Sequence, residues 1–300
     1  MGDWEWPLIL FTVLGQIAIG IILMLWWLAR DRAHLDGQLF KRGVKVSGGL
    51  LILALLASLF HLGHPDAAYR ALTHLSTSWL SREILLFLLT FLAWINLYRQ
   101  ARQLSSGHAL RTDSATMAVA EIEAGQQTNS LSLGLGITSV LGLSGIASSA
   151  MIYVLPRVPA WNNVGPVLFF LLTTGLLGAL CTLALGGKLL QNTQKKFLLK
   201  WSLACTSVSL LIYVIYGSML SVSIEGAASL TFLLNSPLFW ARALLGWFAP
   251  LLLLLSLLKR PQIDQTHLIL TVTLLAGVGE ILGRALFYLS ATGIQITALF

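Results

Sequence analysis

The chain has 300 residues, of which 56% are hydrophobic and only 10% are charged, and its formal net charge is +7 at pH 7. This composition excludes a soluble globular protein and indicates an integral membrane protein. The basic excess does not indicate a nucleic-acid partner, because the basic residues alternate from loop to loop as they do in membrane proteins. We therefore expect an all-α, polytopic protein whose surroundings are the lipid bilayer.

Eight apolar stretches are long enough, or nearly long enough, to cross a bilayer as helices. In chain order they are residues 7–29, 46–62, 80–98, 131–153, 164–187, 197–220, 238–258 and 268–288. They leave no room for a soluble domain, so we expect residues 1–300 to form a single transmembrane domain, an eight-helix bundle. The longest polar connection, residues 99–129, is expected to be a surface loop with room for a short helix.

The basic residues predict the orientation of the bundle. Fourteen of the 19 Lys and Arg residues fall in the loops after the first, third, fifth and seventh stretches: Arg30, Arg32, Lys41, Arg42, Lys45, Arg99, Arg102, Arg111, Lys188, Lys195, Lys196, Lys200, Lys259 and Arg260. By the positive-inside rule these loops face the cytoplasm. The sequence therefore predicts a multi-pass protein of a bacterial inner membrane with both termini in the periplasm.

A histidine and a glutamate lie at the outer side of the second and third stretches, where hydrocarbon is expected. His61 follows Val46 by about 16 residues, which at about 1.5 Å per residue places it at the far edge of a core roughly 30 Å thick. Residues 84–97 are too few to span that core, so their helix should begin near Leu80 and draw Glu83 into the membrane. Ionisable residues inside a membrane indicate function, and a histidine near a carboxylate suits proton transfer at neutral pH. A purely structural pair is the less favoured alternative.

Further charged residues are expected inside the helices on the same outer side. Arg242 falls in the first turns of the seventh stretch, and Glu280 and Arg284 fall in the outer half of the eighth. With Glu225 in the preceding outer loop, they would allow one polar pocket beneath the outer surface. The favoured alternative for Glu280 and Arg284 is a structural ion pair, because residues i and i+4 share one face of a helix.

The pattern of potential ligands does not indicate a metal cofactor. Haem ligands must meet at facing depths, but the six histidines divide between one outer loop (His61, His64 and His74) and the inner loops or their edges (His34, His108 and His267). Cys181 and Cys205 are isolated and are expected to pack as small apolar residues. We expect no haem, iron–sulfur cluster, molybdenum or other metal bound by this chain, so any electron acceptor would belong to a partner.

Several short segments together resemble a known family. They are Glu5-Trp6-Pro7-Leu8, Phe11-Thr12-Val13, Gly15-Gln16, Leu59-Phe60-His61-Leu62-Gly63 with Pro65, Thr77-Ser78-Trp79-Leu80-Ser81-Arg82-Glu83, Tyr153, Pro159, Trp161, Phe169 or Phe170, Thr173 or Thr174, Gly279-Glu280, Gly283-Arg284 and Phe287-Tyr288. With them the chain resembles the DmsC family, the membrane anchor subunits of dimethyl sulfoxide reductase-type molybdoenzymes. The resemblance spans nearly the whole chain, and the segment from His61 to Glu83 is its most specific part.

The resemblance implies a function in anaerobic respiration. Such anchors oxidise menaquinol near the outer face and pass its electrons to a four-cluster iron–sulfur subunit, which feeds a molybdopterin catalytic subunit. It implies that His61 and Glu83 are catalytic, and that Arg82, Glu280 and Arg284 join them in binding the quinol. Two other classes stay open, a small-solute or ion transporter and a passive membrane tether. A transporter would usually show two related halves, and a tether would need no intramembrane histidine and glutamate.

Overall fold

A computed structural model describes the fold. It covers residues 6–30, 35–61, 73–106, 117–259 and 265–291, and within these ranges the side chains of residues 61, 104–106 and 117–128 are not described. The described residues are almost entirely helical, and no strand occurs among them.

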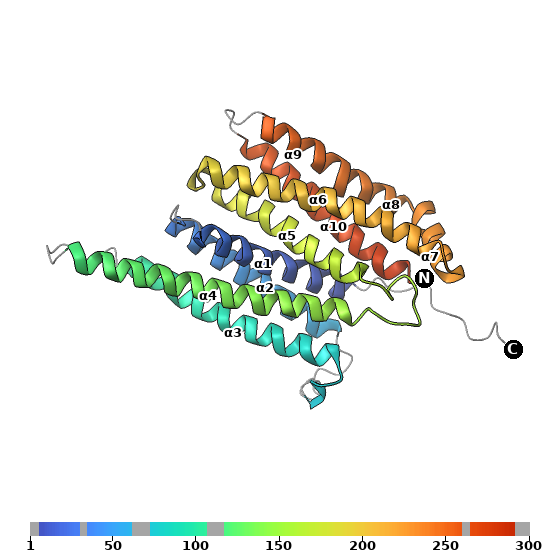
Figure 1. The fold of residues 1–300 in the computed structure, drawn as a ribbon, viewed down its shortest axis with the longest axis horizontal. Helices are drawn as coiled ribbons and strands as arrows, with labels where there is room; N and C mark the ends of the chain where they lie inside the picture. Colours follow the sequence, from blue (N-terminus) through green and yellow to red (C-terminus); the bar gives the residue numbers. More distant parts are fainter. Residues whose placement is uncertain (1–5, 31–34, 62–72, 107–116, 260–264, 292–300) are drawn as a thin grey trace.

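Eight helical segments of the described residues are long and apolar enough to cross a membrane. They are α1 (Trp6–Arg30), α2 (Gly37–His61), α3 (Trp79–Ser106), α4 (Met117–Met151), α5 (Gly165–Gly186), α6 (Asn192–Leu220), the composite span formed by α8 (Pro237–Arg242) and α9 (Ala249–Lys259), and α10 (Thr266–Leu289). The spans lie side by side in one elongated bundle (Figure 1). The all-α transmembrane bundle predicted from the sequence is confirmed.

Four helices extend well beyond their predicted boundaries. α3 continues to Ser106 rather than residue 98, and α6 begins at Asn192 rather than residue 197. α2 begins at Gly37 and α4 at Met117, so much of the connection predicted as a loop at residues 99–129 is helical. A short helix, α7 (Ile224–Asn235), was not predicted, and it carries Glu225 in its first turn. Hydropathy marks the part of a helix that lies in hydrocarbon, whereas these helices continue into polar sequence where their backbone hydrogen bonds are still favourable.

The seventh span contains a π-helical turn between α8 and α9, at Ala243–Phe248. Pro250 lies two residues after the end of this turn. Its ring has no N–H to donate to the carbonyl four residues earlier and clashes with that carbonyl in a regular helix. A wider turn before the proline removes this conflict, and such π turns frequently occur at functional sites. The turn therefore sets where Arg242, the last residue of α8, faces the bundle.

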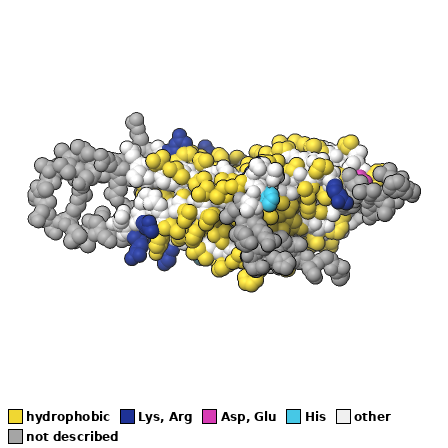
Figure 2. All heavy atoms as spheres, turned by 90° about the horizontal axis from the view of Figure 1, so that it is seen from below, with side chains coloured by type: hydrophobic (Ala, Val, Ile, Leu, Met, Phe, Trp, Pro, Cys, Tyr) yellow, Lys and Arg dark blue, Asp and Glu magenta, His cyan; other side chains and the backbone are white. Residues whose placement is uncertain are grey.

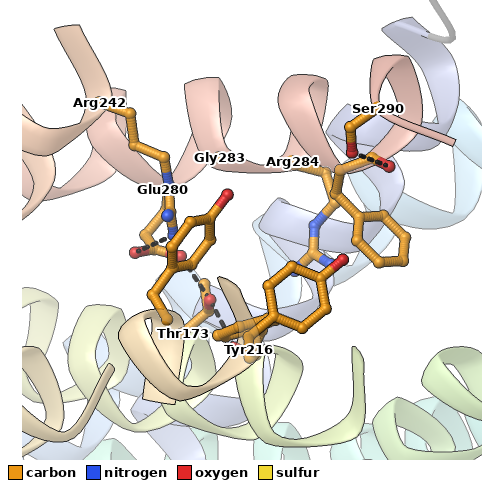
Figure 3. Close-up of a pocket in the computed structure, with 10 residues that line it drawn as sticks. Thr173, Tyr216, Arg242, Glu280, Gly283, Arg284 and Ser290 are labelled. Carbon is orange, nitrogen blue, oxygen red and sulfur yellow. Dashed lines mark hydrogen bonds and ion pairs between the residues drawn. The ribbon is translucent and has the colours of Figure 1, made fainter. Parts of the chain in front are cut away.

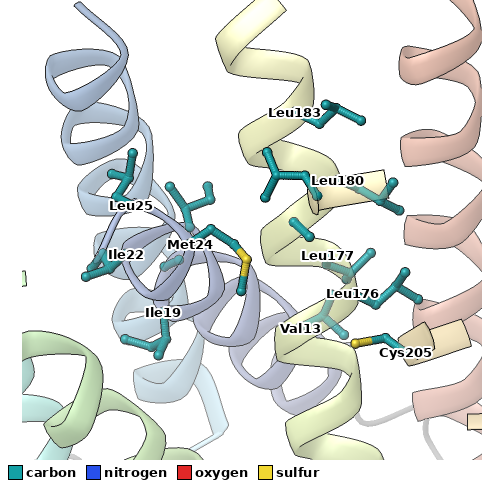
Figure 4. Packing of buried hydrophobic residues seen from close by; sticks show 14 of the residues in the cluster. Val13, Ile19, Ile22, Met24, Leu25, Leu176, Leu177, Leu180, Leu183 and Cys205 are labelled. Atoms are coloured by element: carbon teal, nitrogen blue, oxygen red, sulfur yellow. The ribbon is translucent and has the colours of Figure 1, made fainter. Parts of the chain in front are cut away.

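Helix α1 is the central helix and packs against α2, α4 and α5. Ile19, Ile22 and Leu25 of α1 and Leu176 and Leu180 of α5 are fully or almost fully buried in the core between these helices (Figure 4). Lipid tails are as apolar as these side chains, so close packing rather than exclusion from water holds the helices together.

The two ends of the bundle differ in charge. Basic side chains gather at one end, which we call the basic end: Arg30, Lys41, Arg42, Lys45, Arg99, Arg102, Lys188, Lys195, Lys196, Lys200 and Lys259 (Figure 2, left). Hydrophobic side chains cover much of the surface between the ends. The other end, which we call the opposite end, contains the first turn of α3 and the last turns of α4 and α10.

Candidate functional site

Four ionisable side chains are buried near the opposite end, on three different spans. Glu83 of α3, Arg242 of α8, and Glu280 and Arg284 of α10 are between 5% and 7% exposed. Charged groups inside a membrane are costly unless they are paired or hydrogen-bonded, so their clustering indicates a functional or a strongly structural role.

Arg242 and Glu280 form an ion pair between α8 and α10. The Arg242 Nη2 and Glu280 Oε1 atoms are 3.8 Å apart. Thr173 of α5 donates its hydroxyl to Glu280 Oε2 at 2.5 Å (Figure 3). The Arg242 guanidinium also lies over the Trp247 ring, with 4.3 Å between its Cζ and the ring centroid. The prediction that Arg242 and Glu280 meet in one polar pocket is confirmed.

Arg284 reaches a different partner, although it lies one turn from Glu280 on the same helix. Its Nη2 donates to Gln16 Oε1 of α1 at 3.1 Å, and its Cζ lies 3.6 Å from the centroid of the Phe170 ring. Glu280 is already held by Arg242 and Thr173. The expected i, i+4 ion pair of Glu280 with Arg284 does not form, because each side chain is drawn to another helix.

Glu83 is the fifth residue of α3, which begins at Trp79. The helix therefore starts earlier than its apolar run, as expected, and places the carboxylate inside the bundle. The Ser149 side chain of α4 is its hydrogen-bonding neighbour. One turn further along α3, Phe87 packs against Phe11 of α1 with 5.2 Å between the ring centroids. Glu83 thus faces protein rather than lipid.

Two tyrosines lie close enough to Glu83 and Arg284 to interact with both. Tyr288 in the last turn of α10 donates its hydroxyl to Tyr153, which follows α4, at 3.3 Å. Both phenols interact electrostatically with Glu83 and with Arg284. Burial raises the pKa of Tyr153 well above its ordinary value, so its hydroxyl keeps its proton at neutral pH.

The remaining two predicted site residues lie in or beside the connection between α2 and α3. His61 is the last residue of α2, and its side chain is outside the described part of the sequence. Arg82 donates to the carbonyl oxygens of Leu75 at 2.9 Å and Ser76 at 2.6 Å, and lies over the Trp79 ring at 4.3 Å. These contacts brace the connection before α3, so the structure does not bring Arg82 together with Glu280 and Arg284.

A small cavity of about 30 Å³ lies beside the ion pair. Its walls include Thr173, Tyr216, Arg242, Glu280 and Arg284 (Figure 3). The Nε and Nη1 atoms of Arg242 are buried without a hydrogen-bond partner. A cavity of this size accommodates water rather than a quinone ring. Glu225 does not line it, so its predicted place in the pocket is wrong.

The described residues contain no group of three His, Cys, Asp or Glu side chains that could hold a metal ion. Cys205 is buried and Cys181 half-buried, each as a free thiol. Tyr153, Tyr288 and Gln16 belong to segments that carry the family resemblance, but sequence reasoning did not place them in the buried cluster. Gln16 left a signal, because it is an amide within the apolar helix α1.

The fold and the buried cluster define a multi-pass membrane protein with a charged site beneath one end of its bundle. The family "DMSO reductase anchor subunit (DmsC)" matches residues 1–112 and 127–289. The protein therefore belongs to this family of membrane anchor subunits.

Two of three curated relatives are similar to the protein over almost its whole length. It is 29% identical to the anaerobic dimethyl sulfoxide reductase subunit YnfH of Escherichia coli (strain K12) over 301 residues, which cover 95% of this protein and 94% of the relative. It is also 29% identical to the C subunit of the anaerobic dimethyl sulfoxide reductase of the same organism over 303 residues, with the same coverage of 95% and 94%. The corresponding C subunit from Haemophilus influenzae Rd is 26% identical over 220 residues, 71% of this protein and 69% of the relative.

Proposed function

We propose that this protein oxidises menaquinol in the membrane and passes the electrons to an iron–sulfur partner subunit for anaerobic respiration. The observation that carries the proposal is the Glu83 carboxylate, which is 5% exposed near the end of the bundle at which α2 ends in His61. The named relatives are subunits of anaerobic dimethyl sulfoxide reductases, and such an enzyme needs a source of electrons. A passive tether gives no reason to bury a carboxylate there.

The protein must take up both the protons and the electrons of the quinol. Oxidation of one quinol releases two protons and two electrons. In our proposal the quinol hydroxyl bonds to His61, and His61 and Glu83 accept the protons in turn and release them to water. Taking up the protons lowers the potential at which the quinol gives up its electrons, so the acid–base groups make electron transfer possible. Arg242, Glu280 and Arg284 set the charge near this site.

The electrons leave at the end of the bundle that holds Glu83. Tunnelling falls off steeply with distance, and the described residues contain no metal site that would relay electrons across the membrane. We infer that a four-cluster iron–sulfur subunit docks at the opposite end and feeds a molybdopterin catalytic subunit. The gathering of basic residues at the basic end supports a cytoplasmic location for that end, and hence an inner-membrane protein with periplasmic termini.

The test uses membranes that contain the assembled reductase, with menaquinol as donor and dimethyl sulfoxide as acceptor. Glu83→Gln should slow menaquinol oxidation by about 10² or more, because a general base is lost without a change in side-chain size. His61→Arg should abolish it. In both variants the partner subunits should remain on the membrane, which an immunoblot checks.

The matched control is Tyr98→Phe, at an exposed position on α3 near the basic end. It should oxidise menaquinol at the parent rate. A parent-like rate in Glu83→Gln would make Glu83 structural and would remove the observation on which the proposal depends.

A further inference from the structure

The Tyr153 and Tyr288 hydroxyls form a bond that ties the middle of the sequence to the end of α10. Tyr153 lies in the connection after α4, and Tyr288 lies in the last turn of α10. Aromatic rings surround the pair: the Tyr153 ring is 5.3 Å from both the Trp161 and Phe287 rings. Trp161 is fixed in turn by a 3.0 Å hydrogen bond from its Nε1 to the Phe287 carbonyl oxygen.

The pair differs from a tyrosine that only supports the fold. Tyr216 illustrates the supporting kind, because its buried hydroxyl donates to the Ala160 carbonyl oxygen at 2.6 Å. Within the described residues, neither Tyr153 nor Tyr288 donates to a backbone carbonyl. The two hydroxyls share one hydrogen bond, and when Tyr288 is its donor the proton of Tyr153 is available for another acceptor.

Two charged side chains, Arg284 and Glu83, polarise the two tyrosine hydroxyls. Arg284 lies at the Tyr288 side of the cluster, with its Nε unpaired, and its positive charge interacts with both phenols. Glu83 interacts with both phenols as well. A cation behind a series of O–H donors polarises each donor toward the far side, so the pair favours negative charge on the Glu83 side.

We propose that the Tyr153 hydroxyl is the hydrogen-bond donor to the quinol oxygen that becomes negative during oxidation, with Tyr288 and Arg284 as positioning residues. The inference rests on the proposed quinol oxidation. The quinol O–H bond breaks and its proton goes to His61 or Glu83. The resulting quinolate oxygen accepts the Tyr153 hydrogen bond, and Tyr153 keeps its proton. The second hydroxyl loses its proton to the other of His61 and Glu83, and the two electrons leave one after the other for the partner's iron–sulfur cluster, which completes the oxidation to quinone.

The physical basis is stabilisation of developing charge by a donor that is already in place. Such donors act most strongly where water is excluded, and removing one typically lowers a rate by about 10² to 10³. The Tyr153 side chain is 9% exposed and held by the surrounding rings, so it costs little to hold in position. Burial raises the pKa of Tyr153, which keeps the hydroxyl a donor and prevents it from acting as the base.

The experiment measures the kcat and KM for menaquinol in membranes that contain the assembled reductase. Tyr153→Phe should lower kcat at least about tenfold and leave KM within about threefold, because the lost bond forms with the transition state rather than with the neutral quinol. Tyr288→Phe should lower kcat less. The double variant should be no slower than Tyr153→Phe alone, since the two hydroxyls act as one unit.

Arg284 provides a second, independent readout. Arg284→Gln should lower kcat, and Arg284→Lys should recover much of the loss, because the charge behind the hydroxyl pair is kept. The control Tyr98→Phe should behave as the parent. Immunoblots of the partner subunits separate kinetic loss from failure to assemble, and Tyr288→Phe serves as the test if Tyr153→Phe does not assemble.

An unchanged kcat in an assembled Tyr153→Phe complex, when the parent oxidises menaquinol and Glu83→Gln does not, overturns this inference alone. A raised KM with normal kcat overturns it as well, because that pattern indicates loss of ground-state binding. A parent complex that cannot oxidise menaquinol overturns the proposed function together with the inference.

Discussion

At the residue scale, the partners of the buried charged side chains lie on neighbouring helices and cannot be predicted from spacing along the sequence. Glu280 and Arg284 are correctly spaced for an ion pair within α10, yet Glu280 pairs with Arg242 and Arg284 bonds to Gln16. Sequence spacing identifies which groups are able to meet along one helix. The choice among partners depends on neighbouring helices, and here Thr173 and the Phe170 ring draw the two side chains apart.

This arrangement makes Glu280 and Arg242 interdependent. Glu280→Gln should destabilise the protein by about 3 kcal/mol, because it leaves the Arg242 guanidinium buried without its carboxylate. Replacing both, as in Arg242→Gln with Glu280→Gln, should recover part of the loss since no unpaired charge remains. Thermal unfolding of the purified membrane complex in detergent provides the measurement. Additive losses in the double variant would show that the two side chains are not energetically coupled.

The ion pair of Arg242 and Glu280 also requires a glycine at position 283. A Cβ at this position would overlap the Arg242 side chain, so Gly283→Ala should displace the guanidinium and cost about 1–3 kcal/mol. Gly277 lies on the same helix with nothing within 4 Å of the position a Cβ would take, so Gly277→Ala is the matched control. It should leave the midpoint of thermal unfolding unchanged or raise it slightly. Equal midpoints for the two variants would contradict the packing described for α10.

At the scale of the helices, the sequence predicted which segments cross the membrane but not all of their ends. The apolar stretches of α1, α5 and α10 agree with the observed bounds to within two residues at each end. The early start of α4 and the short helix α7 lie in polar or mixed sequence, where hydropathy does not predict a helix. The π turn depends on how α8 and α9 continue through Pro250, which no apolar pattern records.

The crossing of α1 and α5 is a close backbone contact that a single methyl group can test. A Cβ on Gly178 would overlap the backbone of Gly20, so Gly178→Ala should separate the two helices and lower the amount of folded protein in the membrane. Gly49 of α2 has no atom within 4 Å of its Cβ position, and Gly49→Ala should accumulate like the parent. Immunoblots of membranes and the detergent unfolding midpoint give the comparison. Normal accumulation and stability of Gly178→Ala would show that the crossing tolerates a wider spacing.

At the scale of the whole molecule, orientation links the charge distribution to the mechanism. Cysteines placed at the exposed positions 162 and 192 report the two ends separately. Asn162→Cys should react with an impermeant maleimide in intact spheroplasts, and Asn192→Cys only after lysis, because the basic end should face the cytoplasm. The parent protein, whose Cys181 and Cys205 lie within the helices, is the control for background labelling. The reverse pattern would place the docking face for the partner in the cytoplasm.

The described buried charged side chains all lie near the opposite end of the bundle, and this position determines where protons can be released. Toward the basic end, the described buried polar side chains are mostly hydroxyls and include no buried acid or base. Several of them donate to their own helix, as Thr138 does to Gly134 and Ser202 to Leu198. Among the described residues, no buried titratable side chain there could carry a proton onward, and hydrocarbon-like surroundings oppose its passage. Under the proposed function, protons taken from quinol should be released to the compartment beside the site, and turnover should move no charge across the membrane. In sealed vesicles, quinol oxidation should release protons on one side only and leave a potential-sensitive dye silent.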